Sequence, residues 1–302
     1  MVLLKERLAG LCIVLISVIV TTYDREDALA AVLRSLAGQT DRNFEVVVAD
    51  DGSGPATKTL IEAWRKKLGV PLVHVWQEHR GFRAAEIRNR AIVASRGEYC
   101  IFLDGDCLVR PDFVATHRRL AERGRFLTGN RALLSERLTA KILHEQLAAE
   151  TWGLAVWLGQ RMRSGVNRIG PLLRAPLGPL RKLRGKAWRD ARSCNLAVWR
   201  SDLDRVDGFD AAYIGWGRED SDLLVRLIRS GVRRKDGIYA TGVLHLWHPE
   251  ADRSQLAENQ WRLDQVSASD RVRAVRGLST ILAADTRSEH GRSTMEREGF
   301  RR

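Results

Sequence analysis

Cysteines and long apolar runs are both scarce in this sequence of 302 residues. The four cysteines, Cys12, Cys100, Cys107 and Cys194, form no C-x-x-C pair, and three of them lie in or beside expected buried strands. Disulfides persist mainly in oxidising compartments. We therefore expect reduced core or near-site thiols in a cytoplasmic protein.

The apolar run from Leu11 to Val20 is the one stretch that resembles a signal or membrane segment. It is too short to span a bilayer, which takes about 20 apolar residues. No A-x-A-like cleavage site follows it, and the chain continues directly into the polar stretch TTYDRED. We therefore expect this run to be a central strand.

Acidic residues are fewer than basic ones: the sequence has 37 Asp and Glu and 50 Lys and Arg, which gives a formal charge of +13. This excess suggests an anionic partner, such as phosphates or a membrane surface. No helix-turn-helix, zinc-ligand or RNA-recognition pattern accompanies the charge, so no nucleic-acid partner is expected. An apolar fraction of 44% with nine Trp predicts a folded chain with one large domain, or a domain and an appendage.

Short apolar runs alternate with amphipathic stretches over the first hundred residues. Strands are expected at 13–20, 44–49, 70–76 and 99–103, with helices between them. Asp24 is expected to cap the first helix and Gly38 to end it, and Pro55 opens the second. Repeated βαβ units of this length predict an α/β fold with a mostly parallel sheet covered by helices.

The alternation breaks after Gly129. One amphipathic, Trp-bearing helical stretch is expected over 140–159, and the basic residues that follow are interleaved with leucines and prolines. No acidic residue occurs between the first and last of these bases: Arg161, Arg163, Arg168, Arg174, Arg181, Lys182, Arg184, Lys186 and Arg189. We predict a basic helical insertion at 131–190 between two halves of one domain, 1–130 and 191–250. Residues 251–302 are expected to form a helical extension, with a short docked helix at 278–284, and a flexible tail.

Acidic residues stand where several expected strands end. The D-G-D sequence at 104–106 follows one strand directly, Asp50 and Asp51 follow another, and Asp24 follows the first. Ligands bind at the carboxyl ends of the strands in open α/β sheets. Two carboxylates around one glycine can point at a shared hard cation, for which a nucleotide diphosphate is the usual co-ligand. An acidic turn and simple helix caps are the alternative, because D-x-D alone is common.

Three segments in this order resemble the family 2 glycosyltransferases: ISVIVTTYDRE from Ile16, VVVADDGS from Val46 and CIFLDGDC from Cys100. The resemblance covers about residues 16–249 and implies a single Rossmann-like GT-A domain that binds a UDP-sugar. It implies that Asp51 holds the uracil and that Asp104 orients ribose and metal. The first of these segments also places Thr22 and Tyr23 in the donor site.

The segment between the second and third motifs contributes further candidates. Arg83 matches the position where the family usually has Arg or Lys near the nucleotide, and a guanidinium there can stack on the base or counter phosphate charge. Arg88 and Asn89 lie on the helix that follows, and Asn89 matches a frequent Asn of the family. For these two, a polar helix surface is as good an explanation as a binding role.

A second diagnostic segment is GFDAAYIGWGREDSDLLVRLIRSG, from Gly208. It resembles the W-G-x-E-D segment of β-1,4-galactosyltransferases and chondroitin-polymerase-type transferases. The resemblance implies that Asp220 is the general base, that Glu219 binds the acceptor hydroxyl, and that Trp216 offers an apolar face to the acceptor sugar. An acid-rich helix N-terminus is the alternative. Retaining relatives usually have E-N here, so an Asp at 220 favours inversion.

Two further segments carry implied ligands. In RSCNLAVWR, Asn195 is retained and assigned to the donor site, while Ser193 and Cys194 replace family glycines and leave the sugar open. In VLHLWHPE, a histidine is expected to join Asp106 and Asp104 at the metal; the register favours His245, with His248 as the alternative. An added nitrogen ligand suits Mn²⁺ better than Mg²⁺.

Together these implications describe a metal-dependent inverting glycosyltransferase that moves a hexose or N-acetylhexosamine from a UDP-sugar to a glycan or lipid-linked glycan. Such an enzyme would act in cell-surface polysaccharide, lipopolysaccharide or glycolipid synthesis. A sugar-phosphate nucleotidyltransferase would need a G-x-G-T/S-R-type loop, which TTYDRE does not resemble, and a nucleic-acid-binding protein has only the charge in its favour.

The basic segment 152–189 is expected to dock peripherally on the anionic inner face of the cytoplasmic membrane. Its Trp and Leu side chains would enter the interface, while Arg181, Lys182 and Arg184 meet lipid phosphates. A solvated basic loop is the alternative.

Overall fold

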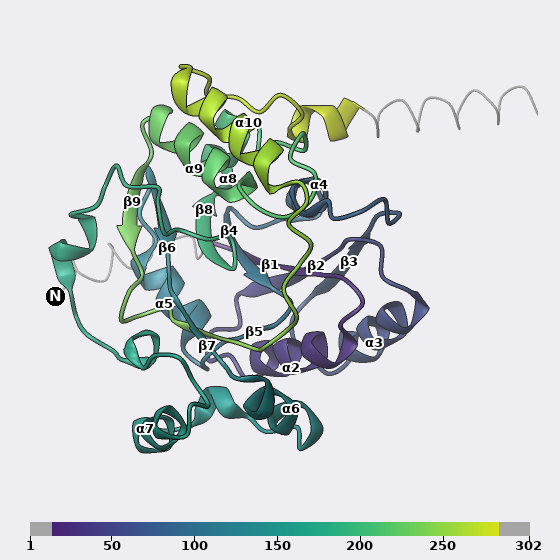
Figure 1. The fold of residues 1–302 in the computed structure, drawn as a ribbon, viewed down its shortest axis with the longest axis vertical. Helices are drawn as coiled ribbons and strands as arrows, with labels where there is room; N and C mark the ends of the chain where they lie inside the picture. The colour runs from purple at the N-terminus through teal and green to yellow at the C-terminus, as the bar shows by residue number, and fades with distance from the viewer. Residues whose placement is uncertain (1–13, 284–302) are drawn as a thin grey trace, which may run out of the picture.

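The computed structural model describes residues 14–283, which surround a seven-stranded sheet of order β3-β2-β1-β4-β8-β6-β9 (Figure 1). Its strands are β1 (Ile16–Thr22), β2 (Phe44–Asp50), β3 (Leu72–Trp76), β4 (Tyr99–Asp104), β6 (Arg125–Thr128), β8 (Asn195–Trp199) and β9 (Arg233–Asp236). A small second sheet has the order β5-β10-β7, formed by β5 (Cys107–Leu108), β7 (Arg131–Leu133) and β10 (Val243–His245).

The pairing brings the acidic strand ends to one edge. Strands β1 to β4 run parallel to one another, so their carboxyl ends meet at the same edge of the sheet. Strand β8 lies antiparallel between β4 and β6, and β6 is parallel to β9. The predicted α/β fold with a mainly parallel sheet is therefore confirmed.

Helices cover both faces of the large sheet (Figure 1). One core contains the apolar sides of α2 (Glu26–Ala37), α3 (Pro55–Arg65), α5 (Phe113–Leu120), α6 (Glu136–His144) and α7 (Leu154–Met162). The other contains those of α4 (Ala84–Ala94), α8 (Arg200–Val206) and α9 (Glu219–Arg229), and α10 (Leu256–Ala268) packs on α9. Short 3₁₀ helices are η1 (Ala149–Thr151), η2 (Gly170–Leu172) and η3 (Gly178–Lys182).

The helical stretch predicted at 140–159 is divided among α6, η1 and α7, because Gln146 takes a left-handed φ of 51° and the backbone at Trp152 and Gly153 is extended. One local prediction was wrong. Asp24 does not cap α2; with a φ of 41°, it accepts a hydrogen bond from the N–H of Gly54 at 2.9 Å and ties together the loops that precede α2 and α3.

The first strand and the short C-terminal helix that the sequence predicts are both present in the described part of the chain. The first strand begins at Ile16, and the part of its prediction at 11–13, with Cys12, lies outside the described residues. A short helix from 278 to 283 packs Leu278 into the core, while the predicted tail lies outside them. Cys100, Cys107 and Cys194 are buried free thiols. Within residues 14–283, no helix is long and apolar enough to cross a membrane.

Candidate active site

The turn at 104–106 needs a glycine at its centre. Asp104 ends β4, and the N–H of Gly105 donates to the carbonyl oxygen of Thr21 at 2.7 Å. A β-carbon at Gly105 would lie 2.8 Å from that oxygen, closer than real contacts allow. The glycine therefore holds both carboxylates at the end of the sheet.

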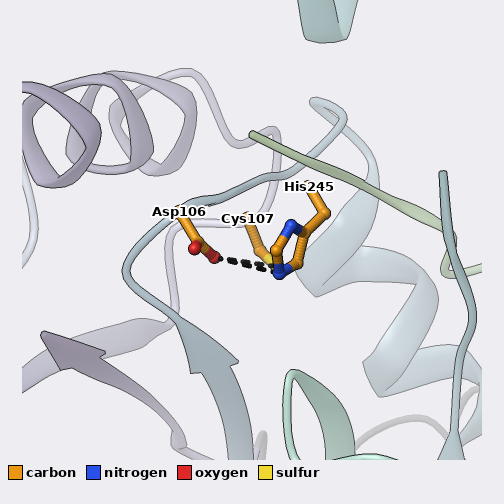
Figure 2. A group of neighbouring side chains, drawn as sticks. All are labelled: Asp106, Cys107 and His245. Carbon is orange, nitrogen blue, oxygen red and sulfur yellow. Dashed lines mark hydrogen bonds and ion pairs between the residues drawn. The ribbon is translucent and has the colours of Figure 1, made fainter. Parts of the chain in front are cut away.

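The small sheet brings two histidines to Asp106. His245 in β10 pairs with Cys107 in β5, which places its Nε2 3.6 Å from Oδ1 of Asp106 (Figure 2). Nε2 of His248 lies 3.4 Å from the other oxygen, Oδ2. Asp106, Cys107 and His245 have ligand atoms within 4.8 Å of one another, so a carboxylate and imidazole could share a divalent cation.

The loop before α9 has a strained backbone. Gly215, Gly217 and Arg218 have φ values of 77°, 100° and 79°. A β-carbon at Gly215 would lie 2.6 Å from Cβ of Gln255, so only glycine fits there. Arg218 adopts a left-handed backbone conformation, which costs free energy in a residue other than glycine. Such strain is concentrated at functional sites.

The first two residues of α9 are acidic and buried. Glu219 accepts a hydrogen bond from Nη1 of Arg88 at 3.0 Å, and Nη2 of Arg88 lies 3.4 Å from Oδ1 of Asp104. Burial and the Asp220 carboxylate raise the pKa of Glu219, although Arg88 opposes the rise. Asp220 accepts from the N–H of Ser193 at 3.4 Å. One guanidinium therefore joins the D-G-D turn to the acidic start of α9.

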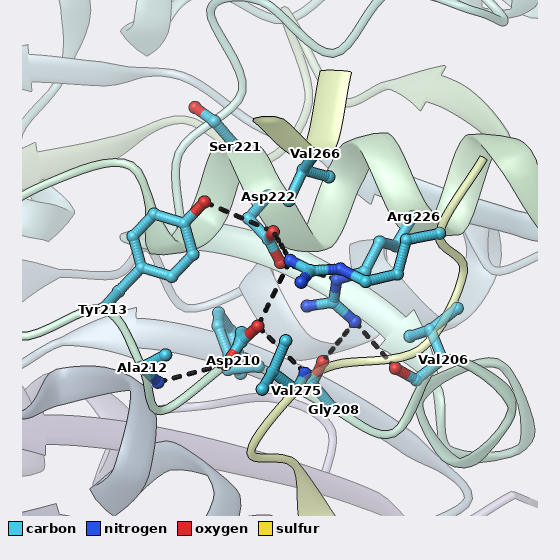
Figure 3. Close-up of polar contacts among 12 residues, drawn as sticks. Val206, Gly208, Asp210, Ala212, Tyr213, Ser221, Asp222, Arg226, Val266 and Val275 are labelled. Atoms are coloured by element: carbon cyan, nitrogen blue, oxygen red, sulfur yellow. Dashed lines mark hydrogen bonds and ion pairs between the residues drawn. The ribbon is translucent and has the colours of Figure 1, made fainter. Parts of the chain in front are cut away.

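A buried ion pair holds α9 in this position (Figure 3). Nε of Arg226 lies 2.6 Å from Oδ1 of Asp222, and both side chains are fully buried. Nη1 of Arg226 also donates to the carbonyl oxygens of Val206 and Gly208 at 2.7 and 2.9 Å, while the hydroxyl of Tyr213 donates to Asp222 at 3.3 Å. The helix is thus fixed to the loop that leads into Gly215-Trp216-Gly217.

The carboxyl end of β2 places a hydrogen-bonded carboxylate, Asp51, close to a stacked aromatic ring, that of Tyr23. Asp51 accepts hydrogen bonds from Nε2 of Gln77 at 2.6 Å and from the backbone N–H of Arg83 at 2.7 Å, and burial raises its pKa. The Tyr23 ring stacks on His79 with centroids 4.3 Å apart and an interplanar angle of 11°. Because Tyr23 is 43% exposed, its other face is open to a flat ligand.

Residues from the D-G-D turn, the start of α9 and the end of β2 line one cleft of about 880 Å³. Its lining includes most of the residues that the sequence predicts for the site: Thr22, Tyr23, Asp51, Asp104, Asp106, Trp216, Glu219, Asp220 and His248. His245 lies beside Asp106 and does not line the cleft itself. The structure thus brings together residues that are spread over more than two hundred positions of the sequence.

Three other candidates point elsewhere. The Arg83 guanidinium binds Glu86 at 2.9 Å and the carbonyl oxygen of Glu78, and only its backbone reaches Asp51. Asn195 is buried and donates to the carbonyl oxygens of Asn130 and Thr241. Asn89 is also buried, where it exchanges two hydrogen bonds with the backbone of Phe209. Asn195 and Asn89 therefore hold together backbone segments around the site and do not face the cleft.

Further arginines, which the sequence analysis did not assign to the site, line the cleft: Arg25, Arg131, Arg192, Arg218 and Arg253. Nη1 of Arg131 lies 3.7 Å from Sγ of Cys194, and the Arg253 guanidinium lies 5.0 Å from the Trp216 ring centroid. Arg192 and Arg218 adjoin motif residues and could have been found from the sequence. Arg131 could not, since its place depends on the pairing of β7 with β10.

A GT-A-like α/β fold, with an acidic cleft at the carboxyl edge of its parallel strands, is the class that this arrangement defines. Comparison with known families gives the particular one: residues 17–166 match Glycosyl transferase family 2, and residues 182–246 match the family described as N-terminal domain of galactosyltransferase. The chain therefore contains a glycosyl transferase family 2 domain, followed by a galactosyltransferase-like C-terminal segment. Both resemblances in the sequence motifs are confirmed.

Individual relatives agree with this assignment. Validoxylamine A glucosyltransferase of Streptomyces hygroscopicus subsp. limoneus is 31% identical over 231 residues, which cover 72% of this chain and 49% of the relative. The chain thus spans about half the length of this relative and of the same enzyme from subsp. jinggangensis.

Solved structures share the fold. Staphylococcus aureus TarS 1–349 in complex with UDP-GlcNAc matches with a TM-score of 0.55 at 18% identity, covering 83% of this chain and 66% of that one. The mannosyltransferase PcManGT from Pyrobaculum calidifontis, in complex with GDP-Man and Mn²⁺, matches with a TM-score of 0.51 at 18% identity, covering 90% and 79%.

Proposed function

We propose that this protein is a metal-dependent inverting glycosyltransferase that moves a hexose or N-acetylhexosamine from a UDP-sugar to a glycan acceptor. The observation that carries the proposal is the single cleft in which the D-G-D turn and the acidic start of α9 are joined by Arg88. One end of this cleft suits a nucleotide diphosphate, and the other holds a candidate base.

The uridine would lie over the exposed face of Tyr23, beside Asp51. A stacked ring next to a carboxylate that already holds two N–H groups is a rigid platform for a base. The complex of TarS with UDP-GlcNAc supports a uridine donor by fold likeness. Thr22 would contact the same half of the donor, while Arg83 would act through its backbone, since its side chain is engaged by Glu86.

Asp106 and His245 would hold the metal, with Asp104 as a further oxygen ligand and His248 as the alternative histidine. The carboxylate and imidazole set suits Mn²⁺, which PcManGT binds, and Mg²⁺ is the alternative. When bound, the cation would neutralise charge on the diphosphate of the leaving group.

Asp220 would remove the proton from the attacking acceptor hydroxyl. It begins α9 in a buried position, fixed by hydrogen bonds from Ser193 and Ser221, so little reorganisation is needed on binding. Glu219 would bind the same hydroxyl or its neighbour, and Trp216 would support the sugar ring. Holding both substrates in line supplies much of the remaining acceleration.

The acceptor proposed here is an anionic glycan or lipid-linked glycan of cell-surface polysaccharide, lipopolysaccharide or glycolipid synthesis, met at the inner face of the cytoplasmic membrane. Arg192 and Arg218 support it, because both line the cleft near Asp220, and within residues 14–283 neither side chain forms an ion pair. A phosphate or uronate group would supply the missing counter-charge.

Release of UDP tests the donor half of this proposal directly. The purified full chain is incubated with UDP-glucose, UDP-galactose, UDP-GlcNAc and UDP-GalNAc in Mn²⁺, and UDP released by slow hydrolysis is measured. At least one donor should be hydrolysed in a manner that Asp106→Asn abolishes. Hydrolysis of none, or hydrolysis that survives in Asp106→Asn, would contradict it.

A further inference from the structure

The helix α7 lies at the edge of the molecule next to α6 (Figure 1). It exposes apolar side chains and contributes no residue to the cleft. Leu154, Leu158 and Met162 are 48%, 50% and 88% exposed. They are spaced four residues apart, so they share one face of the helix. Trp157, roughly a quarter turn around the helix from this face, is buried against Trp152, with ring centroids 5.2 Å apart, and anchors the helix to the core.

Single exposed apolar side chains are common on protein surfaces, but this stretch concentrates them. Val156 in α7 is 47% exposed, and the chain that follows adds Leu173, Leu180 and Leu183, at 37%, 59% and 78%. An apolar helix face that none of the residues 14–283 covers indicates a contact with a membrane or with another molecule.

The charge of the segment favours a membrane. No Asp or Glu occurs from Thr151 to Arg189. Arg161 and Arg163 close α7 and are exposed, and within the described part of the chain neither side chain forms an ion pair. An apolar stripe flanked by unpaired arginines is the pattern of helices that lie in the interface of anionic membranes.

The residues that the sequence analysis expected to meet lipid phosphates, Arg181, Lys182 and Arg184, already have partners within the protein. Arg181 is buried and donates to the carbonyl oxygens of Ala175, Asp236 and Ile238, so it cannot meet lipid phosphates as expected. The neighbouring bases Lys182 and Arg184 already pair with acidic residues, at 2.7 and 3.0 Å. Trp157, one of the Trp side chains of this segment that were expected at the interface, faces the core instead.

We infer that α7 docks on an anionic lipid surface, with Leu154, Leu158 and Met162 in the interface and Arg161 and Arg163 at the headgroup phosphates. At nine residues, the helix lies in the plane of the interface and does not span the bilayer. Docking of α7 is independent of the transfer reaction, because α7 supplies no residue to the cleft.

Vesicle sedimentation with the purified full chain tests the inference. Sucrose-loaded vesicles of phosphatidylcholine, alone or mixed with phosphatidylglycerol, are spun with the protein at low and high salt. The wild type should sediment with phosphatidylglycerol vesicles and lose most binding at high salt. Leu158→Ser with Met162→Ser should weaken binding about tenfold or more, and Arg161→Gln or Arg163→Gln about fivefold each.

A matched control removes exposed apolar groups at the other end of the molecule. Trp261→Ser with Val275→Ser changes side chains that are 55% and 62% exposed in and after α10 (Figure 1), and it should sediment like the wild type. UDP release measured on every variant should be unchanged, which separates this inference from the proposed reaction.

Three results would overturn docking: no sedimentation of the wild type with phosphatidylglycerol vesicles at low salt, equal sedimentation of the Leu158/Met162 variant, or an equal loss in the control. A fourth result, self-association of the protein, would also overturn docking. If gel filtration shows a wild-type dimer that Leu158→Ser with Met162→Ser dissociates, and no vesicle binding, the stripe is an interface between two copies of this chain.

Discussion

Nη1 of Arg88 lies 3.0 Å from Oε1 of Glu219, and this contact joins residues 131 positions apart in the sequence. Arg88 lies on α4 in the donor half of the sheet, while Glu219 begins α9 on the acceptor side. Both side chains are buried, at 5% and 10% exposure. The two halves of the proposed site are therefore held together by one guanidinium.

Loss of Arg88 should be costly for stability. In Arg88→Met, Glu219 and Asp104 lose their shared counter-charge, and a buried charge left without its partner typically costs about 3–5 kcal/mol. Urea unfolding measures the change. Arg90→Gln is the matched control, since Arg90 is a half-buried arginine on the same helix that pairs with Glu86, and it should change the free energy of unfolding by about 0.5 kcal/mol or less. Equal effects of the two changes would contradict the structural role of Arg88.

Metal dependence should follow Asp106. Asp106→Asn should abolish transfer and weaken UDP-sugar binding, because it removes the charged ligand between the two histidines. Activity assays with and without EDTA, followed by readdition of Mn²⁺, measure the effect. His245→Gln and His248→Gln separate the two candidate ligands, and the ligand is the one whose loss raises the Mn²⁺ concentration needed for half-maximal activity. Full activity of Asp106→Asn, or of the wild type in excess EDTA, would refute a metal here.

Asp220→Asn should separate binding from chemistry. The amide keeps the shape of the side chain but cannot accept a proton, so kcat should fall by about 10²-fold or more while donor binding stays nearly intact. Titration of UDP binding and steady-state transfer kinetics measure the two effects. Glu219→Gln should instead raise the acceptor KM. A wild-type rate for Asp220→Asn across the pH range would place the base elsewhere.

The Glu122 carboxylate should contribute to stability in a pH-dependent way. Burial would raise its pKa, but hydrogen bonds from Lys182, Lys235 and Arg125 lower the pKa of Glu122 to about 2. A depressed folded-state pKa stabilises the protein above the usual value of 4.5, and this stabilisation is lost as the pH falls toward about 2. Glu122→Gln should therefore be less stable than the wild type at pH 7, by an amount that shrinks through this acidic range.

Urea unfolding at a series of pH values measures that difference. The control is Glu98→Gln, whose side chain pairs with Arg123 while both are more than half exposed, so its effect should be small at every pH. A difference for Glu122→Gln that stays constant from neutral pH to about 2 would show that the three cations do not act on this carboxylate.

The sequence by itself determined the α/β fold, and most of the residues that it predicts for the site do line the cleft. Apolar runs that end in acidic residues predict parallel strands, and in such a sheet the carboxyl ends meet at one edge. Thr22, Asp51 and Asp104 therefore had to lie near one another. The GWGRED segment was recognisable because its glycines have no other local explanation, and Gly215 indeed has a φ and a neighbour that exclude a side chain.

Only the tertiary structure decided which polar side chains face the cleft and which face inward. Asn195, Arg83 and Arg181 are as polar as the residues of the cleft, but their side chains donate hydrogen bonds to backbone carbonyls or to a neighbouring carboxylate. Arg88 and Arg131 reach the cleft through contacts with segments far away in the sequence. Periodicity and motif spacing describe local structure, whereas the partner of a buried polar group depends on which distant segment packs against it.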